Sequence, residues 1–383
     1  MPQLARLMLS GLPKRPEPPV EAAPSMRAVS SRVVHLDNGS VVLGLDGPIP
    51  VVQALEAYFD PWFQRSEREP TVTVRMKFHH PTDSSLDSGP PKGWSRLERL
   101  RSENANHTWY VYRSHSSTGC PTFFIPENRS FISPKPSERA VEIVSPHESG
   151  LVWDAKEVVQ RQVVQPLMLE THVMLHAAGV LIGNHGVAIA GHKGSGKSTL
   201  QLHLAAGGAG LISADRLFVC VDGTGALFAR GYPARMSLHR DNFSRFPQLG
   251  DPEVLPGDGL SKVLLHPADA AQRLKTQFAG GAELGAILLL RRGDRRAPLL
   301  RRLRPYEIRD AIAAHQMAPP DPIVRDWLGL FSANRAPALG LWPSAVERMS
   351  CSVQGVEVAS DQLTDFPPRD AVRWLESVFE WRD

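Results

Sequence analysis

Short apolar runs with strand spacing dominate the first 150 residues of the chain. Arg32–His35 and Ser40–Leu45 flank Asp37-Asn38-Gly39, a sequence that favours a tight hairpin turn. In Thr71–Phe78, apolar residues alternate with polar ones, which is the period of a half-buried strand. Pro50–Phe63 has the spacing of a short helix, and the remaining runs add the strand candidates His107–Arg113, Thr122–Ile125 and Ala140–Val144. We therefore predict a β-rich N-terminal module over residues 32–150, preceded by a flexible, proline-rich tail over residues 1–31.

From residue 151 the pattern changes to strands that alternate with helices. Asp154–Glu170 predicts a helix that Pro166 kinks or ends, and His172–Leu181 and Gly186–Ala190 predict strands joined by a turn. The later segments add strands at Leu211–Ser213, Leu217–Val221 and Ala286–Leu290, and helices at Ser198–Ala206, Tyr306–Ala314, Ile323–Leu330 and Asp370–Trp381. This alternation predicts an α/β domain over residues 151–300 and a helical C-terminal extension over residues 301–383.

Composition narrows the class of protein. The chain has 383 residues, of which 42% are hydrophobic and 22% charged, enough to bury a large core. A net charge of +3 gives no reason to expect a nucleic-acid partner. Its three cysteines are far apart in the sequence, which fits a reducing cytoplasm better than a disulfide framework. No apolar run approaches the roughly 18 residues of a membrane span, so we expect a cytoplasmic protein without a membrane partner.

One motif carries specific chemistry. Eight residues match the phosphate-binding pattern G-x-x-x-x-G-K-[ST], and a threonine follows them: Gly191, His192, Lys193, Gly194, Ser195, Gly196, Lys197, Ser198 and Thr199. The glycines let backbone amides curl around phosphates, Lys197 reaches the outer phosphates, and the Ser198 hydroxyl suits Mg²⁺. An apolar strand precedes the match and a helical pattern follows it. We therefore predict a site for ATP and Mg²⁺ rather than a glycine-rich turn that binds nothing.

Other polar residues are candidates for the same site. Asp215 follows a predicted strand, where it could bind Mg²⁺ or accept a proton, or else cap a loop. His176 interrupts an apolar strand, which suits either an interior residue or a catalytic one. A basic run after another predicted strand is typical of a solvated surface, with an acidic peptide or phosphates as alternative ligands: Arg291, Arg292, Arg295, Arg296, Arg301, Arg302 and Arg304.

These segments together resemble the catalytic domain of HPr kinase/phosphorylase and of HPr-kinase-like serine kinases. In that family a strand pair carrying a His precedes the P-loop, and an Asp-bearing strand follows it; here Leu175–Val180, Ala190–Thr199 and Leu211–Asp215 have this order. The resemblance extends from Asp154 to Arg292. It implies a P-loop kinase core of the phosphoenolpyruvate-carboxykinase-like type, a mixed sheet with flanking helices.

The resemblance also implies roles for individual residues. Lys197 would hold the phosphates, Ser198 would bind Mg²⁺, Asp215 would accept the proton of the acceptor hydroxyl, and His176 would sit beside the transferring phosphate. The chain departs from the family at two places. Ala214 stands where family members have a first acid of a pair, and Phe228 stands where a Glu supplies a second metal ligand. The reverse, phosphorylase reaction therefore stays open.

We expect a Mg²⁺-dependent kinase that transfers the γ-phosphate of ATP to a hydroxyl, most simply a serine on a peptide or small protein. A precursor peptide of a natural-product pathway is one such acceptor. Two alternatives remain at this point, a small-molecule kinase and a nucleotide-binding regulatory module without transfer chemistry. The sequence leaves the oligomeric state open, including a homo-oligomer.

Overall fold

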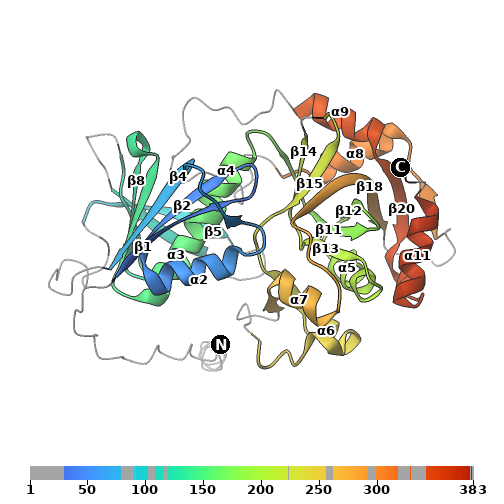
Figure 1. The fold of residues 1–383 in the computed structure, drawn as a ribbon, viewed down its shortest axis with the longest axis horizontal. Helices are drawn as coiled ribbons and strands as arrows, with labels where there is room; N and C mark the ends of the chain where they lie inside the picture. Colours follow the sequence, from blue (N-terminus) through green and yellow to red (C-terminus); the bar gives the residue numbers. More distant parts are fainter. Residues whose placement is uncertain are drawn as a thin grey trace, which may run out of the picture.

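The computed structural model places two β-sheets side by side, each with its own helices (Figure 1). It describes residues 30–78, 90, 92–101, 108–114, 120–222, 224–255, 262–291, 299–317, 328, 342–379 and 381. Both sheets mix parallel and antiparallel pairs, so the predicted α/β class is confirmed at the level of a mixed-sheet protein with several helices. Within these residues no helix is both long and apolar enough to cross a membrane.

The first sheet is built from residues 31–145 in the order β3-β1-β2-β4-β9-β8-β7-β6-β5. In β4, Val72, Val74 and Met76 face the core while the residues between them face outward, as the alternation predicts. The strands are β1 (Ser31–Asp37), β2 (Val42–Pro48), β3 (Gln64–Arg65), β4 (Val72–Phe78), β5 (Ser95–Arg101), β6 (Thr108–Arg113), β7 (Phe123–Ile125), β8 (Ser130–Lys135) and β9 (Ala140–Ser145). A helix after β2, α2 (Ile49–Phe59), packs against β1 and β2. The strands β3, β5 and β8 had no counterpart in the sequence prediction.

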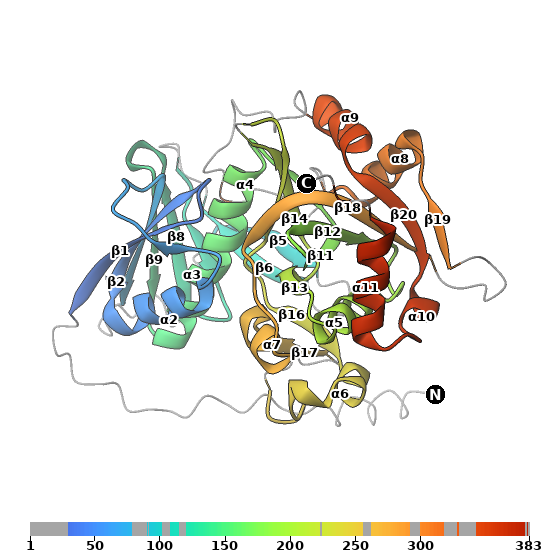
Figure 2. The same ribbon diagram turned by 45° about the vertical axis from the view of Figure 1, so that its right-hand side comes forward.

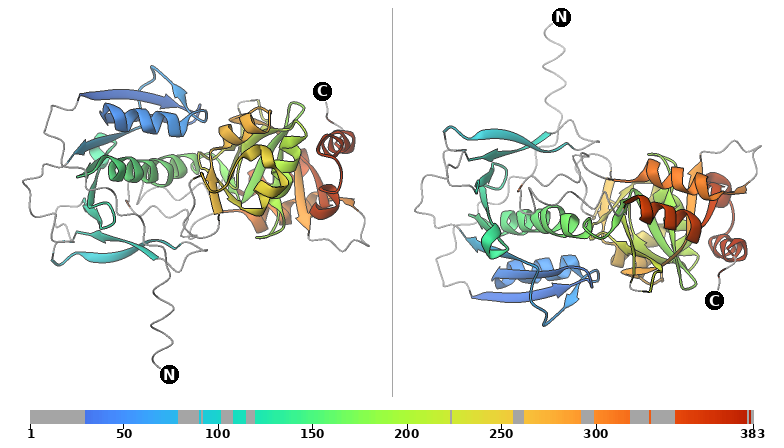
Figure 3. Two further views of the ribbon diagram at one scale, coloured as in Figure 1. Left: turned by 90° about the horizontal axis from the view of Figure 1, so that it is seen from below. Right: turned by 90° about the horizontal axis from the view of Figure 1, so that it is seen from above.

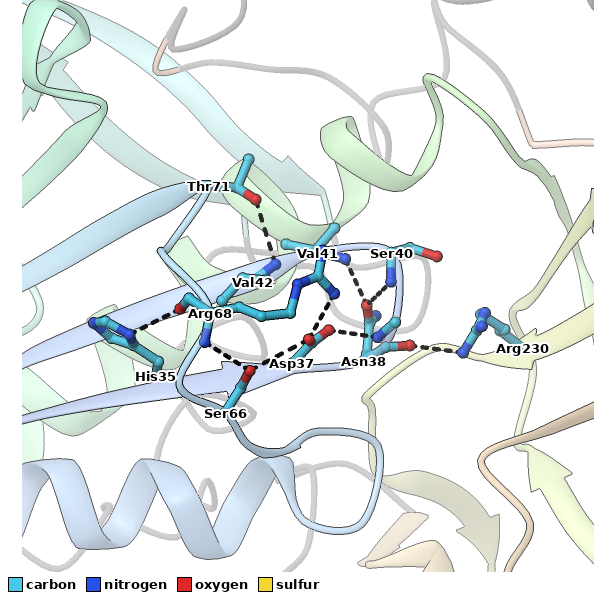
Figure 4. A network of polar contacts seen from close by, with 11 residues as sticks. His35, Asp37, Asn38, Ser40, Val41, Val42, Ser66, Arg68, Thr71 and Arg230 are labelled. Carbon is cyan, nitrogen blue, oxygen red and sulfur yellow. Dashed lines mark hydrogen bonds and ion pairs between the residues drawn. The ribbon is translucent and has the colours of Figure 1, made fainter. Parts of the chain in front are cut away.

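The predicted hairpin joins β1 to β2 and its turn is fixed by side chains (Figure 4). Gly39 has φ +86°, a conformation that glycine adopts without strain. The Asn38 side-chain oxygen accepts the backbone N–H groups of Ser40 and Val41 at 3.0 and 2.8 Å. The Asp37 carboxylate accepts the Gly39 N–H at 2.6 Å. Asx side chains commonly bond to backbone in this way, so the turn type follows from the local sequence.

A single helical segment leads from the first sheet to the second (Figure 3). It comprises α3 (Glu148–Glu157), the π-helical η3 (Val158–Val164) and α4 (Gln165–Met168). The helix continues past Pro166 to Met168, so the prediction that Pro166 ends the helix is wrong. Proline cannot donate to the carbonyl four residues earlier, and the wider π turn just before it accommodates that loss. The π segment also places Gln160 between the two sheets, where its amide donates to Tyr58 Oη at 2.8 Å and to Pro233 O.

The second sheet has the order β10-β14-β15-β18-β12-β11-β13, with β20 beside β18 and β19 beside β20. The long strand β18 curves across this sheet (Figure 2) and pairs in parallel with both β12 and β20. Its strands are β10 (Val173–Leu175), β11 (Ala177–Ile182), β12 (His185–Ala190), β13 (Gly210–Ser213), β14 (Leu217–Val221), β15 (Leu227–Gly231), β18 (Gly281–Arg291), β19 (Leu300–Arg302) and β20 (Gln354–Ala359). The strand β12 is apolar along its length because both of its faces are covered.

Helices cover both faces of this second sheet (Figure 1). One face packs against α5 (Lys197–Ala206), α11 (Pro368–Val378) and a subdomain of β16 (Met236–His239), α6 (Asp241–Arg245), η4 (Pro247–Leu249), β17 (Lys262–Leu265) and α7 (Pro267–Arg273). The opposite face packs against α8 (Pro305–His315) and α9 (Trp342–Ser352). Two further short helices are η2 (Pro136–Glu138), between β8 and β9 of the first sheet, and α10 (Ser360–Leu363), directly after β20.

Two sequence predictions need correction here. The segment His172–Leu181 is two strands, since β10 pairs with β14 whereas β11 pairs with β12, and the chain changes partner at His176. The C-terminal segment is not only helical, because β20 completes the second sheet by pairing with β18. The predicted helices Tyr306–Ala314 and Asp370–Trp381 are present as α8 and α11, although α11 ends at Val378. The predicted helix Ile323–Leu330 lies outside the described residues except for Leu328.

The two sheets are joined by a shared hydrophobic core and by a hydrogen bond from Arg230 to the hairpin. Met174, Phe218 and Tyr232 of the second sheet's region belong to the core of the first sheet. At the hairpin tip, Arg230 of β15 donates from Nη1 to the carbonyl oxygen of Asn38 at 2.6 Å (Figure 4). A Cβ on Gly39 would lie 3.1 Å from the Arg230 guanidinium, so the glycine also makes room for this contact.

Arg230→Ala is expected to lower the free energy of unfolding by about 1–3 kcal/mol, because the half-buried Asn38 carbonyl loses a charged donor. The matched control is Arg68→Ala, which removes an exposed ion pair between the β3–β4 loop and Asp37 of the hairpin and should cost less than about 1 kcal/mol. Urea denaturation of both variants measures the difference. Equal effects would show that Arg230 is no more than a surface residue.

Burial also predicts a pH dependence. The His172 ring packs edge-on against Phe218 at 6.0 Å, and burial lowers its pKa to about 4, with the charge of Arg230 adding to the shift. The unfolded chain therefore binds a proton on this residue between pH 6.5 and 4 that the folded chain does not. This contribution to stability is fully present above pH 6.5 and is lost as the pH falls towards 4.

His172→Phe keeps the aromatic contact and removes the titration. As the pH falls from 6.5 to 4, the wild type should lose up to about 3 kcal/mol of its free energy of unfolding through this residue. His172→Phe should not show this loss. His147→Phe, at an exposed position, is the control and should follow the wild-type curve. Parallel curves for the wild type and His172→Phe would contradict the assignment.

Candidate functional site

Strand directions in the second sheet bring the predicted site residues to one edge. β11 runs antiparallel to both β12 and β13, so β12 and β13 end on the same side. The predicted P-loop, residues 191–198, follows β12; Asp215 follows β13, and His176 immediately precedes β11 at this edge. The parallel strand β20 ends there too, and its following residue Ser360 donates from Oγ to the Ser195 carbonyl at 2.8 Å. The topology therefore gathers side chains that are up to 184 residues apart in sequence (176 to 360).

The P-loop itself has the conformation that its glycines allow. Gly194 and Gly196 have φ of +76° and +93°, in the left-handed region where a side chain would be strained. A Cβ on Gly191 would come within 2.5 Å of the buried Ser195 hydroxyl. Gly196 caps α5, whose first residues are Lys197, Ser198 and Thr199. The loop thus leads directly into a helix N-terminus, where backbone N–H groups favour an anion.

Lys197 points back into the loop. Its ammonium donates to the carbonyl oxygens of Gly191 at 2.6 Å and His192 at 3.3 Å. Burial lowers the pKa of Lys197, and the nearby carboxylate of Asp215 opposes that shift. The two predicted residues are therefore close enough to interact, although they belong to different elements. His192, Lys193 and Asp215 are exposed, so this edge of the sheet is open to a ligand.

Gln201 fixes the P-loop helix to the strand that carries Asp215. Its side chain is buried, one turn after Lys197 on α5, and donates to Gly179 O at 3.0 Å and Ser213 O at 2.5 Å. Ser213 is two residues before Asp215. Thr199 is fixed in a similar way, since its hydroxyl donates to the Asn242 side chain at 3.1 Å. Thr199 was predicted as part of the nucleotide site, whereas Gln201 and Asn242 were not, because they lie outside the P-loop pattern.

Three histidines lie around Lys197. His176 is half-buried at the junction of β10 and β11, and its backbone N–H donates to the carbonyl of His315 at 2.7 Å. The rings of His315 and His192 are 5.6 Å apart. Sequence reasoning selected His176 and His192 but missed His315. Local sequence shows only that His315 ends a helix, whereas its place beside the P-loop comes from long-range pairing.

The donor set suits Mg²⁺ in company with a nucleotide. Mg²⁺ in nucleotide sites usually takes one or two protein oxygens and completes its shell with phosphates and water. Ser198, in the first turn of α5, and the exposed Asp215 can supply those two oxygens. The described residues hold no cluster of three or more His, Cys, Asp or Glu side chains suited to a metal, so a cage made of protein alone is absent from that part of the chain. Ser198 and Asp215 stay predicted ligands.

Two other predictions concern Phe228 and the basic run. Phe228 lies on β15, opposite Glu283 of β18, with the Arg230 guanidinium 5.0 Å from its ring. In the basic run, Arg301 pairs with Glu307 and Glu357, and Arg302 donates to Val378 O at 2.9 Å. These arginines stabilise the C-terminal segment. Arg292, Arg295 and Arg296 lie outside the described residues.

Comparisons with known proteins add little. No family model and no curated protein matches the chain. Among solved structures, the HPr(Ser) kinase/phosphatase from Coxiella burnetii is similar over 34% of this chain and 76% of its own, with 18% identity and a TM-score of 0.21. A similarity at this level establishes neither the fold nor the function.

Gln201→Met should lower the free energy of unfolding by about 1–3 kcal/mol, because the buried carbonyls of Gly179 and Ser213 lose their donor while the volume is kept. Gln53→Met, at an exposed position of α2, is the matched control and should change it by less than about 0.5 kcal/mol. Urea denaturation decides between them. An unchanged free energy of unfolding in Gln201→Met would mean that the hydrogen bonds from Gln201 to Gly179 and Ser213, the Gln201 clamp, are not needed for stability.

Proposed function

We propose that the chain is a Mg²⁺-dependent kinase that transfers the γ-phosphate of ATP to a hydroxyl, most simply a serine of a peptide or small protein in the cytoplasm. The observation that carries the proposal is the placement of Lys197 and Asp215. A P-loop lysine and an exposed carboxylate interact at the same edge of a sheet, and the Gln201 clamp holds their elements together.

This arrangement suits phosphoryl transfer, which asks little covalent chemistry of the protein. The loop amides and the start of α5 would hold the phosphates, and Lys197 would exchange the Gly191 carbonyl for phosphate oxygens. Mg²⁺, bound by Ser198 and Asp215, would neutralise charge on the phosphates. Asp215 would accept the proton of the acceptor hydroxyl, and His176 would lie beside the phosphoryl group that is transferred. Rate enhancement would come from positioning and electrostatic stabilisation.

One observation favours a second candidate, a nucleotide-binding module without transfer chemistry. Ala214 and Phe228 stand where the family that the sequence resembles has acids, so of those family positions only that of Asp215 carries a carboxylate here. The presence of Lys197, Ser198 and Asp215 together opposes this candidate. A small-molecule acceptor is the remaining alternative to a peptide, and a precursor peptide of a natural-product pathway is one form that a peptide acceptor could take.

Lys197→Ala and Asp215→Asn should each reduce phosphoryl transfer by at least about a thousandfold, since one removes phosphate charge stabilisation and the other removes the base. Asp215→Asn should still bind ATP. In the assay, the purified protein is incubated with radiolabelled ATP and with an extract of its source cells that has been separated into protein, peptide and metabolite fractions. The label that enters each fraction is then measured. Label in peptides or proteins, rather than in metabolites, would support the proposed acceptor class.

Lys135→Ala and Asp310→Asn alter exposed charges away from the P-loop and should keep full activity. Full transfer by Asp215→Asn would refute the base assignment. Saturable ATP binding by the wild type, with no transfer to any fraction, would favour the module without transfer chemistry.

A further inference from the structure

A buried histidine that no motif selects lies beside the P-loop. His315 is the last residue of α8 and is only 7% exposed. Its ring is 5.6 Å from the ring of His192, with the planes tilted by 59°. Burying a polar ring costs free energy unless the ring makes a hydrogen bond.

The backbone holds His315 firmly in place. Its carbonyl accepts the His176 N–H at 2.7 Å, the next residue Gln316 forms a β-bridge with Leu175, and the Met317 N–H donates to Met174 O at 2.8 Å. Residues 315–317 thus lie antiparallel beside β10, joined to it by one β-bridge. At the other end of α8, the Glu307 side chain accepts the Arg304 N–H. The backbone of His315 is therefore fixed by both the helix and the bridge.

The electrostatic environment keeps this imidazole neutral. Burial lowers the pKa of His315 to about 4, and the charge of Lys197 adds to the shift, followed by His192 and His176. A neutral imidazole offers one N–H donor and one acceptor. Donors that are already oriented in a partly desolvated site stabilise phosphate oxygens strongly, because they need no reorganisation.

The position relative to the loop indicates which phosphate is concerned. In a P-loop the backbone amides cradle the inner phosphates, and the lysine reaches outward to the β- and γ-phosphates. His315 comes from a different element and approaches the loop at Lys197 and His192. With a nucleotide bound in this way, His315 would stand at the outer end of the phosphate site, where a triphosphate has a group that a diphosphate lacks.

We propose that His315 is a specificity-determining residue of the nucleotide site, whose imidazole N–H donates to the terminal phosphate of a nucleoside triphosphate. This inference rests on the nucleotide site of the proposed function, but not on the transfer reaction. It adds a neutral donor from α8 to the lysine and the amides of the P-loop, and it makes the C-terminal segment part of the site.

The test compares dissociation constants for two Mg²⁺-bound nucleotides, ADP and the non-hydrolysable triphosphate AMP-PNP, by calorimetry on the full chain. His315→Leu removes the donor at similar volume, and His315→Gln keeps an N–H donor. We expect His315→Leu to weaken AMP-PNP binding about tenfold and to change ADP binding less than about twofold. His315→Gln should recover part of the loss. Arg309→Ala, at an exposed position of the same helix, is the control.

Each outcome decides a separate point. Equal weakening of both nucleotides by His315→Leu would show that the residue only supports the loop, and unchanged binding of both would show that it makes no phosphate contact. Either result overturns the proposal. If His315→Leu does not fold, as judged by thermal unfolding, an unchanged ratio of the ADP and AMP-PNP dissociation constants in His315→Ala overturns it instead. Failure of the wild type to bind either nucleotide would refute the nucleotide site itself.

Discussion

The directions of three neighbouring strands decide what this protein can do. Since β12 and β13 both run antiparallel to β11, the P-loop and Asp215 emerge at the same edge of the sheet. Gln201 then ties the P-loop helix to the end of β13 through a buried hydrogen bond to Ser213. A lysine at the start of a helix and an acid at the end of a strand can act on one ligand only if both constraints hold.

The remainder of the chain supports this edge from outside the motif. Ser360, after β20, donates to the Ser195 carbonyl, and residues 315–317 form a β-bridge beside His176. The N-terminal sheet contributes through the shared core, where the ring of Tyr232 packs 4.9 Å from the guanidinium of Arg216, the residue after Asp215. The first sheet is thus in contact with residues that border the site, which gives it a structural part in placing Asp215.

Local patterns in the sequence predict much of this structure. The hairpin at Asp37-Asn38-Gly39, the alternating strand β4 and the strand–loop–helix around Lys197 each have their cause within a few residues, so they were predictable. The break at His176 was not, because it depends on β10 pairing with β14, which comes after the P-loop. The place of His315 was not predictable either, because it depends on pairing with a segment about 140 residues earlier. The strand β20 was missed for the same reason: a short strand within a helical pattern becomes recognisable only when its partner β18 is known.

A structure of the complex with Mg²⁺ and AMP-PNP tests the central claim most directly. The account predicts that the Lys197 ammonium leaves the Gly191 carbonyl and contacts the outer phosphates, with Mg²⁺ between Ser198 and the Asp215 carboxylate. A triphosphate bound away from the P-loop, or an Asp215 carboxylate turned away from the terminal phosphate, would contradict it.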